Sequence, residues 1–186
     1  MSEPNKKIGY ILARELGQNA FIGGLLVTDE KGFPVEFRYT DPVTPSKLQR
    51  IIYGNALDKY LIVEVIARSL LESLHDKPGL FITDSKLILE MSEVLSAPLI
   101  SIQESGQSPL PEMGHVKKLD NGEILMQIHP SGGPAHITYA GSEDGFEKVQ
   151  PLIAELGNEM DILEPLKRIS SALKEIMENS DEPRKK

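Results

Sequence analysis

The stretch that decides the fold spans residues 28–54 and reads TDEKGFPVEFRYTDPVTPSKLQRIIYG. Within it, residues 33–39 alternate apolar and polar side chains, and this period of two is typical of a β-strand. The preceding residues 21–28 are apolar, and the segment between the two runs holds Asp29 and Gly32, which favour a tight turn. The sequence therefore predicts a β-hairpin here.

A helix is predicted directly after this hairpin. Pro42 and Pro45 make the connection extended, and Thr44 is in the position of an N-cap with Pro45 as the first helical residue. The helix carries apolar side chains on one side, at Leu48, Ile51 and Ile52. Gly54 then bends the helix or separates it from a second one.

Two further patterns extend the prediction on either side. Residues 7–15 alternate like a strand, so that three consecutive strands joined by short turns form an antiparallel meander. Residues 57–74 are apolar over most of a helical circumference, apart from one charged stripe at Glu64, Arg68 and Glu72. We expect this helix to be covered by the sheet on one side and by another helix or a partner chain on the other.

The second half of the chain predicts more strands and helices. Short apolar strands at 80–83 and 99–102 enclose a helical pattern, which gives a βαβ unit and a sheet that is parallel in part. A second hairpin, 123–129 with 135–140, surrounds a Pro-Ser-Gly-Gly-Pro turn, and two amphipathic helices follow. The predicted fold is α/β: a mixed sheet with an antiparallel N-terminal meander, one βαβ unit, a second hairpin and packed helices.

We divide the chain into four segments on this basis. They are an α/β core at 1–103, a loop or linker at 104–115, a hairpin with two helices at 116–178 packed on the same core, and a frayed tail at 179–186.

Composition narrows the classes of function. The 186 residues contain no cysteine, which excludes disulfide frameworks, thiolate zinc sites and cysteine nucleophiles. No apolar run approaches the about 18 residues of a membrane span, and the N-terminus is too polar for a signal peptide, so we expect a soluble cytoplasmic protein. The net charge of −8, scattered basic residues and absence of tryptophan argue against nucleic acid as a partner.

Three carboxylates are the candidate catalytic residues. Asp29 and Asp84 each follow a strand that ends in threonine, and Glu36 lies on the polar face of the second hairpin strand. Carboxylates gathered at strand ends can hold Mg²⁺. The simpler interpretations are a turn residue at Asp29, an N-cap at Asp84 and a charge pair with Arg38 at Glu36.

A candidate anion site combines residues from the hairpin and from the helix that follows it. Arg38 is positioned to hold an anion if the polar face of the sheet lines a cleft. Tyr53, Arg50 and Asp41 can meet one another where the connection crosses the start of the helix, whose N-terminus attracts anions. The alternative is a local network that holds the proline-rich connection in place.

His129 and His136 are the candidate metal ligands, because they flank the turn of the second hairpin. If the two strands pair symmetrically, the imidazoles come close beside the backbone N–H groups of a Gly-Gly turn and can bind a metal or an anion. The alternative is a pair of polar residues at the mouth of a turn. No phosphate-loop, HExxH or nucleophile-elbow pattern occurs, and the sequence requires no cofactor.

Two resemblances extend this interpretation. The run FIGGLLVTDEKGFPVEFRYTDPVTPSKLQRIIYG resembles a family of bacterial proteins to which no activity is assigned, over about residues 8–74. The order of hairpin, long helix, short strand and helix is also similar to RNase H-like modules such as the middle domain of peptide-release factors. That similarity implies an arrangement of elements and no catalytic residues.

The sequence favours a binding or scaffold protein in the cytoplasm, self-associating or bound to another protein, over an enzyme. The apolar helix and the absence of a recognisable catalytic set support this hypothesis. Two alternatives remain: a metal-assisted phosphoester hydrolase that uses Asp29, Asp84 and Glu36 or His129, and a small-anion sensor.

Overall fold

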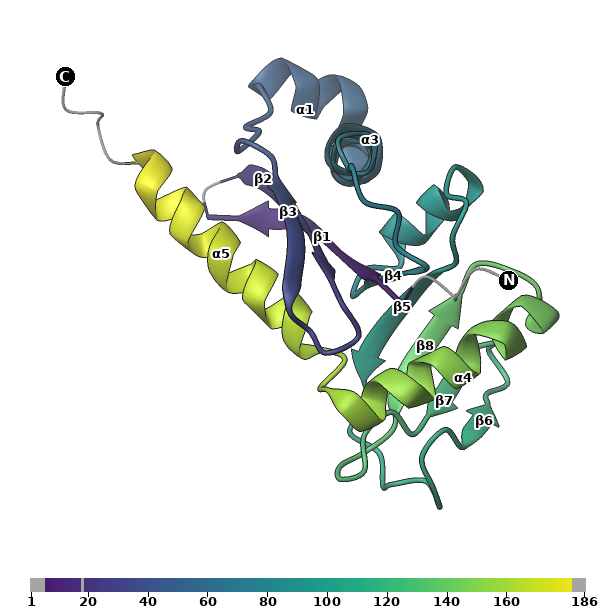
Figure 1. Ribbon diagram of the computed structural model, residues 1–186. Coiled ribbons are helices and arrows are strands. Elements are labelled where there is room, and N and C mark those ends of the chain that lie inside the picture. Colours follow the sequence, from purple (N-terminus) through teal and green to yellow (C-terminus); the bar gives the residue numbers. More distant parts are fainter. Residues whose placement is uncertain (1–5, 18, 182–186) are drawn as a thin grey trace.

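The computed structural model describes residues 6–17 and 19–181 and shows one mixed sheet of eight strands between two helical layers (Figure 1). The strand order is β3-β2-β1-β4-β5-β8-β7-β6. The strands are β1 (Ile8–Leu16), β2 (Ala20–Thr28), β3 (Pro34–Tyr39), β4 (Leu80–Thr83), β5 (Leu99–Glu104), β6 (Val116–Lys118), β7 (Ile124–Met126) and β8 (Ala135–Tyr139).

Strand directions confirm the predicted α/β class. β1, β2 and β3 form the antiparallel meander, while β4 runs parallel to both β1 and β5. β8 then pairs antiparallel with β5, and β7 and β6 complete the sheet in antiparallel pairs. The predicted βαβ unit and second hairpin are therefore both present, and β6 is a strand that the sequence did not predict.

Eight helical segments accompany the sheet in the described part of the chain. They are α1 (Lys47–Tyr53), η1 (Gly54–Ala56), α2 (Leu57–Lys59), η2 (Tyr60–Ala67), α3 (Arg68–Glu72), η3 (Leu87–Glu93), α4 (Glu143–Glu159) and α5 (Glu164–Asp181). The predicted helix at 57–74 is thus a composite, whose central part η2 is a π-helix. At the end of η2 the Arg68 N–H donates to the carbonyl oxygen of Val63, five residues earlier, which is the wider turn of a π-helix.

Each face of the sheet has its own core because side chains alternate along the strands. Ile8, Tyr10 and Leu12 lie under α4 and α5, whereas Ile11 and its neighbours lie under η2. Gly23 permits the close approach of η2: a Cβ atom there would lie 2.3 Å from Cγ2 of Ile66. The composite helix also packs against η3 within the same core, while Tyr60, Glu64 and Ser69 on its outer side are exposed.

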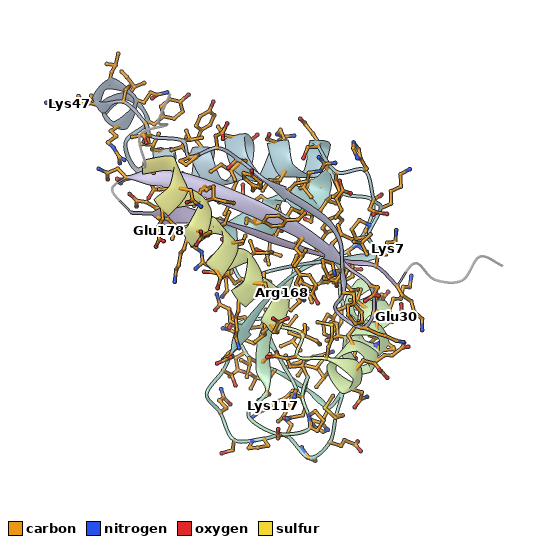
Figure 2. The ribbon with its side chains drawn as sticks, turned by 60° about the vertical axis from the view of Figure 1, so that its left-hand side comes forward. Lys7, Glu30, Lys47, Lys117, Arg168 and Glu178 are labelled. Atoms are coloured by element: carbon orange, nitrogen blue, oxygen red, sulfur yellow. The ribbon has the colours of Figure 1, made fainter. Side chains whose placement is uncertain are left out.

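α1 begins two residues later than predicted and packs differently. Its N-cap is Ser46, not Thr44, because Ser46 and Gln49 form a reciprocal capping box. None of its residues is buried, and Leu48, Ile51 and Ile52 are 67%, 68% and 73% exposed. Figure 2 shows Lys47, the first residue of α1, at one end of the molecule and Lys117 near the other.

The segment 105–115 contains no helix or strand, and the chain after it returns to the same sheet through β8.

Arg168 fixes α5 to the first hairpin, since its Nη2 donates to the Gly32 carbonyl oxygen at 2.8 Å. Among the described residues, no helix combines the length and apolarity that crossing a bilayer demands.

Candidate functional site

The three parallel strands end at one edge of the sheet. Ile11, Thr83 and Ser101 lie at the same level of β1, β4 and β5, and each strand ends shortly beyond. From β1 the chain turns to β2 on one side, and from β4 it proceeds to β5 on the other. A sheet whose connections diverge in this way leaves a crevice outside the carboxyl ends of its strands, where ligands bind.

A cavity of about 390 Å³ occupies this position. Arg14 lines it from β1, Asp84 from the residue after β4 and Glu104 from the end of β5, while Leu166 and Lys167 close it from α5. The Arg14 guanidinium forms an ion pair with the Asp84 carboxylate. Three strand ends and one helix thus bring together side chains that are far apart in sequence.

A second cavity of about 360 Å³ continues the first, since Glu104 and Leu163 line both. Its far wall is the loop at 129–134, which includes Gly132 and Gly133. We call the two cavities together the strand-end groove. It is lined by Arg14, Asp84, Ile102, Gln103, Glu104, Ser105, Gly106, Ile128, His129, Ser131, Gly132, Gly133, Pro134, Ala135, Asp161, Leu163, Leu166, Lys167 and Ser170.

A buried glutamine holds the loop that forms this far wall. Gln127 is 3% exposed, and its Nε2 donates to the carbonyl oxygens of His129 at 2.8 Å and Gly132 at 3.1 Å. Its Oε1 accepts from the Leu110 N–H at 2.9 Å. A buried amide needs such partners, so the loop is fixed from inside. The signal in the sequence is one amide, Gln127, in the otherwise apolar run of residues 124–128.

The groove carries both signs of charge. Arg14 and Lys167 are its cations, and Lys167 Nζ lies 3.8 Å from a Glu104 oxygen and 3.7 Å from an Asp161 oxygen. These contacts are exposed and long, so they leave Lys167 able to exchange its partners for an incoming anion. Gln103 donates to the Asp84 carbonyl oxygen at 2.7 Å and supports the end of β4.

The three predicted catalytic carboxylates do not come together. Oδ1 of Asp29 accepts from the N–H groups of Lys31 and Phe33, both at 2.9 Å, as in the turn interpretation. Because β2 is antiparallel to β1, Asp29 lies at the opposite end of the sheet from Asp84. Their separation along the strands is about 16 Å at about 3.3 Å per residue, and of these three carboxylates only Asp84 lines the groove.

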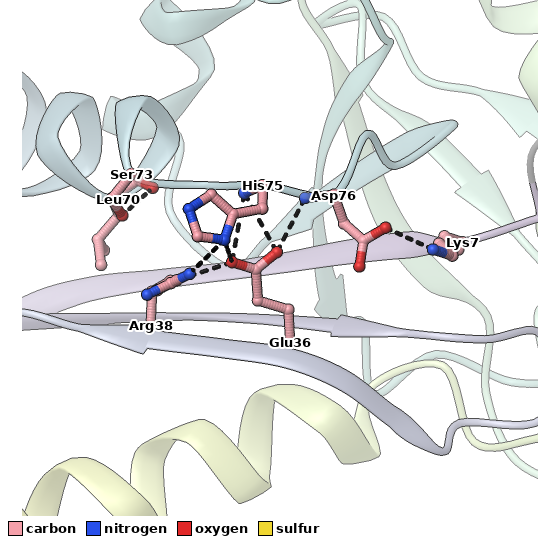
Figure 3. Close-up of polar contacts among 7 residues, drawn as sticks. All are labelled: Lys7, Glu36, Arg38, Leu70, Ser73, His75 and Asp76. Carbon is pink, nitrogen blue, oxygen red and sulfur yellow. Dashed lines mark hydrogen bonds and ion pairs between the residues drawn. The ribbon is translucent and has the colours of Figure 1, made fainter.

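Glu36 belongs to a separate cluster at the end of α3 (Figure 3). Its carboxylate accepts from the backbone N–H of Asp76 at 2.9 Å, from the N–H of His75 at 3.2 Å, and from Arg38 Nε at 2.7 Å. Partial desolvation would raise the pKa of Glu36, but these donors together outweigh it and lower the pKa below its ordinary value of 4.5.

The predicted anion-site residues are also dispersed. Arg38 is occupied by Glu36 and lies 2.8 Å, measured from Nη2, from the Nδ1 atom of His75. Tyr53 instead contacts Tyr60, with ring centroids 4.7 Å apart, and the hydrogen bond between the two hydroxyls raises the pKa of Tyr53. His75 and Tyr60 lie near opposite ends of the composite helix, roughly 20 Å apart at 1.5 Å per residue.

The two remaining residues of that set lie near α1. Arg50 is in the last turn of α1, and Asp41 is an exposed residue of the connection between β3 and α1. Neither lines the strand-end groove.

The histidines do not face each other across the second hairpin. His136 lies opposite Leu125, and its Nδ1 is 3.6 Å from an Oε2 atom of Glu123. His129 lies beyond the last strand pair, with its Nδ1 2.8 Å from the Ser131 carbonyl oxygen. Among the described residues, no three His, Asp or Glu side chains are grouped as a metal site would need.

The donor set in the groove does not fit a metal centre either. Beside Asp84, β1 presents the apolar side chain of Leu12 and the cation Arg14 toward α5. The Arg14 guanidinium occupies the Asp84 carboxylate and repels a divalent ion there, and a hard cation would need several oxygen ligands besides. A divalent ion could be held at Asp84 only if the ion pair between Arg14 and Asp84 opened.

Comparison with solved structures shows the fold. Human endonuclease V matches with a TM-score of 0.62 and 14% identity over 94% of this chain and 86% of that one. The catalytic domain of the human protein matches with a TM-score of 0.63 and 13% identity, over 96% of this chain and 86% of that one. A third match is endonuclease V from Ciona intestinalis, solved with DNA containing an inosine followed by a ribo-adenosine. Its TM-score is 0.59 and its identity 15%, over 93% of this chain and 86% of that one. No protein-family model matches the chain, and a search of curated proteins finds no match.

These neighbours confirm the RNase H-like arrangement that the order of elements implied, and they correct two expectations. The prediction of a scaffold without a nucleic-acid partner is wrong, because the fold extending over nearly the whole chain is that of nucleases, one of which is solved with DNA bound. Net charge and aromatic content averaged over the whole chain do not describe a groove, because a groove contacts its ligand locally.

Proposed function

We propose that this protein binds a nucleic-acid strand in the strand-end groove. The single observation that carries the proposal is the position of the groove at the carboxyl ends of β1, β4 and β5, in a fold shared with a nuclease solved in complex with DNA. Such ends are where open α/β sheets bind their ligands.

Two cations of the groove, Arg14 and Lys167, can contact a phosphate backbone, and they lie among three carboxylates, Asp84, Glu104 and Asp161. Arg14 and Lys167 lie on facing sides of the first cavity, one from the sheet and one from α5. Each can contact a phosphate oxygen, and Lys167 gives up only long surface ion pairs to do so. The Gly132-Gly133 loop brings backbone close to the second cavity without intervening side chains, which lets a strand approach.

Arg14 has a second task in this proposal. Its ion pair neutralises Asp84, which would otherwise repel a phosphate at the same strand end. Removing Arg14 therefore takes away one attraction and exposes one repulsion. The ion pair is partly exposed, with side-chain exposures of 38% and 34%, so its loss should leave the fold intact.

The test is fluorescence anisotropy with a labelled single-stranded oligo-dT, an equivalent RNA, a duplex and a strand containing inosine. Arg14→Ala should weaken strand binding about tenfold, and Lys167→Ala about threefold, each with a salt dependence reduced by about one counterion. Lys148→Ala is the matched control, since Lys148 lies on α4 outside the groove and should bind like the unaltered protein. Equal affinities for all three variants, or no binding at low salt, would refute the proposal.

Metal-assisted phosphoester hydrolysis is the second candidate function. The observation in its favour is that the carboxylates of Asp84 and Glu104 line the same cavity. Cleavage of a bound strand in the presence of Mg²⁺ or Mn²⁺, lost in Asp84→Asn and kept in Asp29→Asn, would establish it. An intact strand under the same conditions, with binding retained, supports binding alone.

A further inference from the structure

A cavity of about 630 Å³ lies apart from the strand-end groove and is larger than either of its two parts. It is enclosed by the β6–β7 hairpin, the end of β8 and the first turns of α4, and it shares no residue with the groove. Figure 1 shows α4 lying along this end of the sheet, with β6 at its outer edge. Its volume is within the range of about 300–1,000 Å³ that is usual for small-molecule sites.

The walls of this cavity are aromatic and aliphatic. Tyr139 and Phe146 contribute two rings whose centroids are 6.1 Å apart at an angle of 54°. Val116, Leu119 and Ile124 line the side formed by the hairpin. Such walls bind the faces of a planar ligand, while a few polar groups fix its orientation.

Two glycines fix the Tyr139 ring as one wall. A Cβ atom on Gly141 would lie 2.5 Å from the ring, and one on Gly145 would lie 2.6 Å from the phenol oxygen. The ring therefore lies directly against the backbone where α4 begins. This close packing supports the ring from the side of the backbone.

The rim of the cavity is acidic. Glu123, Glu143 and Glu147 line it, against the single cation Lys118, which is paired with Glu143. Glu123 is held by Lys86, then by Asn121, and these contacts lower its pKa, so it is ionised at neutral pH. Glu147 makes no hydrogen bond or ion pair with any residue that the structure describes.

We propose that this cavity binds a planar nitrogen heterocycle of nucleoside size that carries an exocyclic amino group and no phosphate. The flat faces of the ligand lie against Tyr139 and the aliphatic wall. Ionised carboxylates only accept hydrogen bonds, so Glu147 selects an amino group at the edge of the ring. A phosphate is disfavoured because Glu123 and Glu143 are each paired with a lysine while the carboxylate of Glu147 is paired with no cation that the structure describes, so the rim remains negative.

Calorimetric titration of the full chain with adenosine, purine riboside and adenosine 5′-monophosphate tests this selectivity. Purine riboside lacks only the exocyclic amino group of adenosine, and the monophosphate adds a charged phosphoryl group. Adenosine should bind at least tenfold more tightly than either of the other two. Equal affinity for the three compounds, tighter binding of the monophosphate, or no heat of binding with millimolar adenosine would overturn the proposal.

Two substitutions place the binding in this cavity. Leu119→Trp fills the cavity and should abolish adenosine binding, whereas Leu87→Trp, on η3 outside the cavity, should not alter it. Glu147 is exposed, so Glu147→Gln should leave the fold intact. This substitution should weaken the binding of adenosine several-fold and reduce the difference in affinity between adenosine and adenosine 5′-monophosphate. Unchanged adenosine affinity in both Leu119→Trp and Glu147→Gln would contradict the site, and if Leu119→Trp does not fold, the Glu147→Gln result decides.

Discussion

At the scale of single residues, Glu36 connects two parts of the chain that are nearly 40 positions apart. Its carboxylate, on the edge strand β3, accepts the backbone N–H groups of His75 and Asp76 just after α3 (Figure 3). Asp76 in turn forms an ion pair with Lys7 just before β1. The side chain of Glu36 is only 11% exposed, so its loss would leave these donors without an equivalent acceptor.

Glu36→Gln should lower the free energy of unfolding by about 1–2 kcal/mol, because a neutral amide accepts these hydrogen bonds less strongly than a carboxylate. Glu64→Gln is the matched control: Glu64 forms an exposed i,i+4 pair with Arg68, and its loss should change stability by about 0.5 kcal/mol or less. Urea unfolding at pH 7 measures both. Equal effects of the two substitutions would show that the cluster does not stabilise the fold.

The same cluster predicts a dependence on pH. The pKa of Glu36 is lower in the folded protein than its ordinary value of 4.5, so the folded state binds this proton less readily than the unfolded state. The stability that Glu36 contributes is therefore complete above about pH 4.5 and declines as pH falls through the folded-state pKa. Urea unfolding at several pH values should show the difference between the unaltered protein and Glu36→Gln shrink in acid. A constant difference down to pH 3 would contradict this assignment.

At the scale of elements, Gly157 determines how α4 packs on the sheet. Alanine normally stabilises a helix by about 1 kcal/mol relative to glycine. At this position, however, a Cβ atom would lie 1.9 Å from the carbonyl oxygen of Ile128, which is backbone and cannot move aside. Gly157→Ala should therefore destabilise the protein by about 2 kcal/mol or more in thermal or urea unfolding, with Lys148→Ala as a neutral control on the same helix. A stabilised Gly157→Ala variant would show that α4 does not lie this close.

Local patterns predicted most elements of the fold, and tertiary packing explains those they missed. The alternation at residues 33–39 and the Asp-to-Gly turn before it identified the first hairpin, because both signals are local. β6 was missed because Val116–Lys118 is three residues long and holds one apolar side chain. The π-helical turn of η2 has no sequence period of its own.

At the scale of the whole molecule, the candidate site was largely invisible in the sequence. Arg14, Asp84, Glu104 and Lys167 meet only because β1, β4 and β5 are neighbours and α5 crosses their ends. Strand order is a property of the assembled sheet, so the sequence identified only Asp84 and His129 among the residues of the groove. It grouped Asp84 with Asp29 and Glu36, which lie elsewhere. The usable signal was that a charged residue follows the apolar run of each parallel strand, at Arg14, Asp84 and Glu104.

The distribution of charge over the molecule explains why net charge misled the choice of partner. Five acidic residues that contribute to the net charge of −8 lie on α4 and do not line the strand-end groove: Glu143, Asp144, Glu147, Glu155 and Glu159. Exposed charges beyond about 10 Å are largely screened at moderate salt. Recognition in the groove therefore depends on how its own two cations and three carboxylates are placed, and the net charge of the chain does not describe it.

The most direct test of the central claim is the mapping of amide chemical shifts while single-stranded DNA is titrated into the isotope-labelled protein. We expect the shifts to concentrate at the ends of β1, β4 and β5, the loop at 129–134 and the first turns of α5, and to diminish in Arg14→Ala. Shifts confined to α1 or α4, with the amides of the strand-end groove unchanged at saturating DNA, would contradict the account.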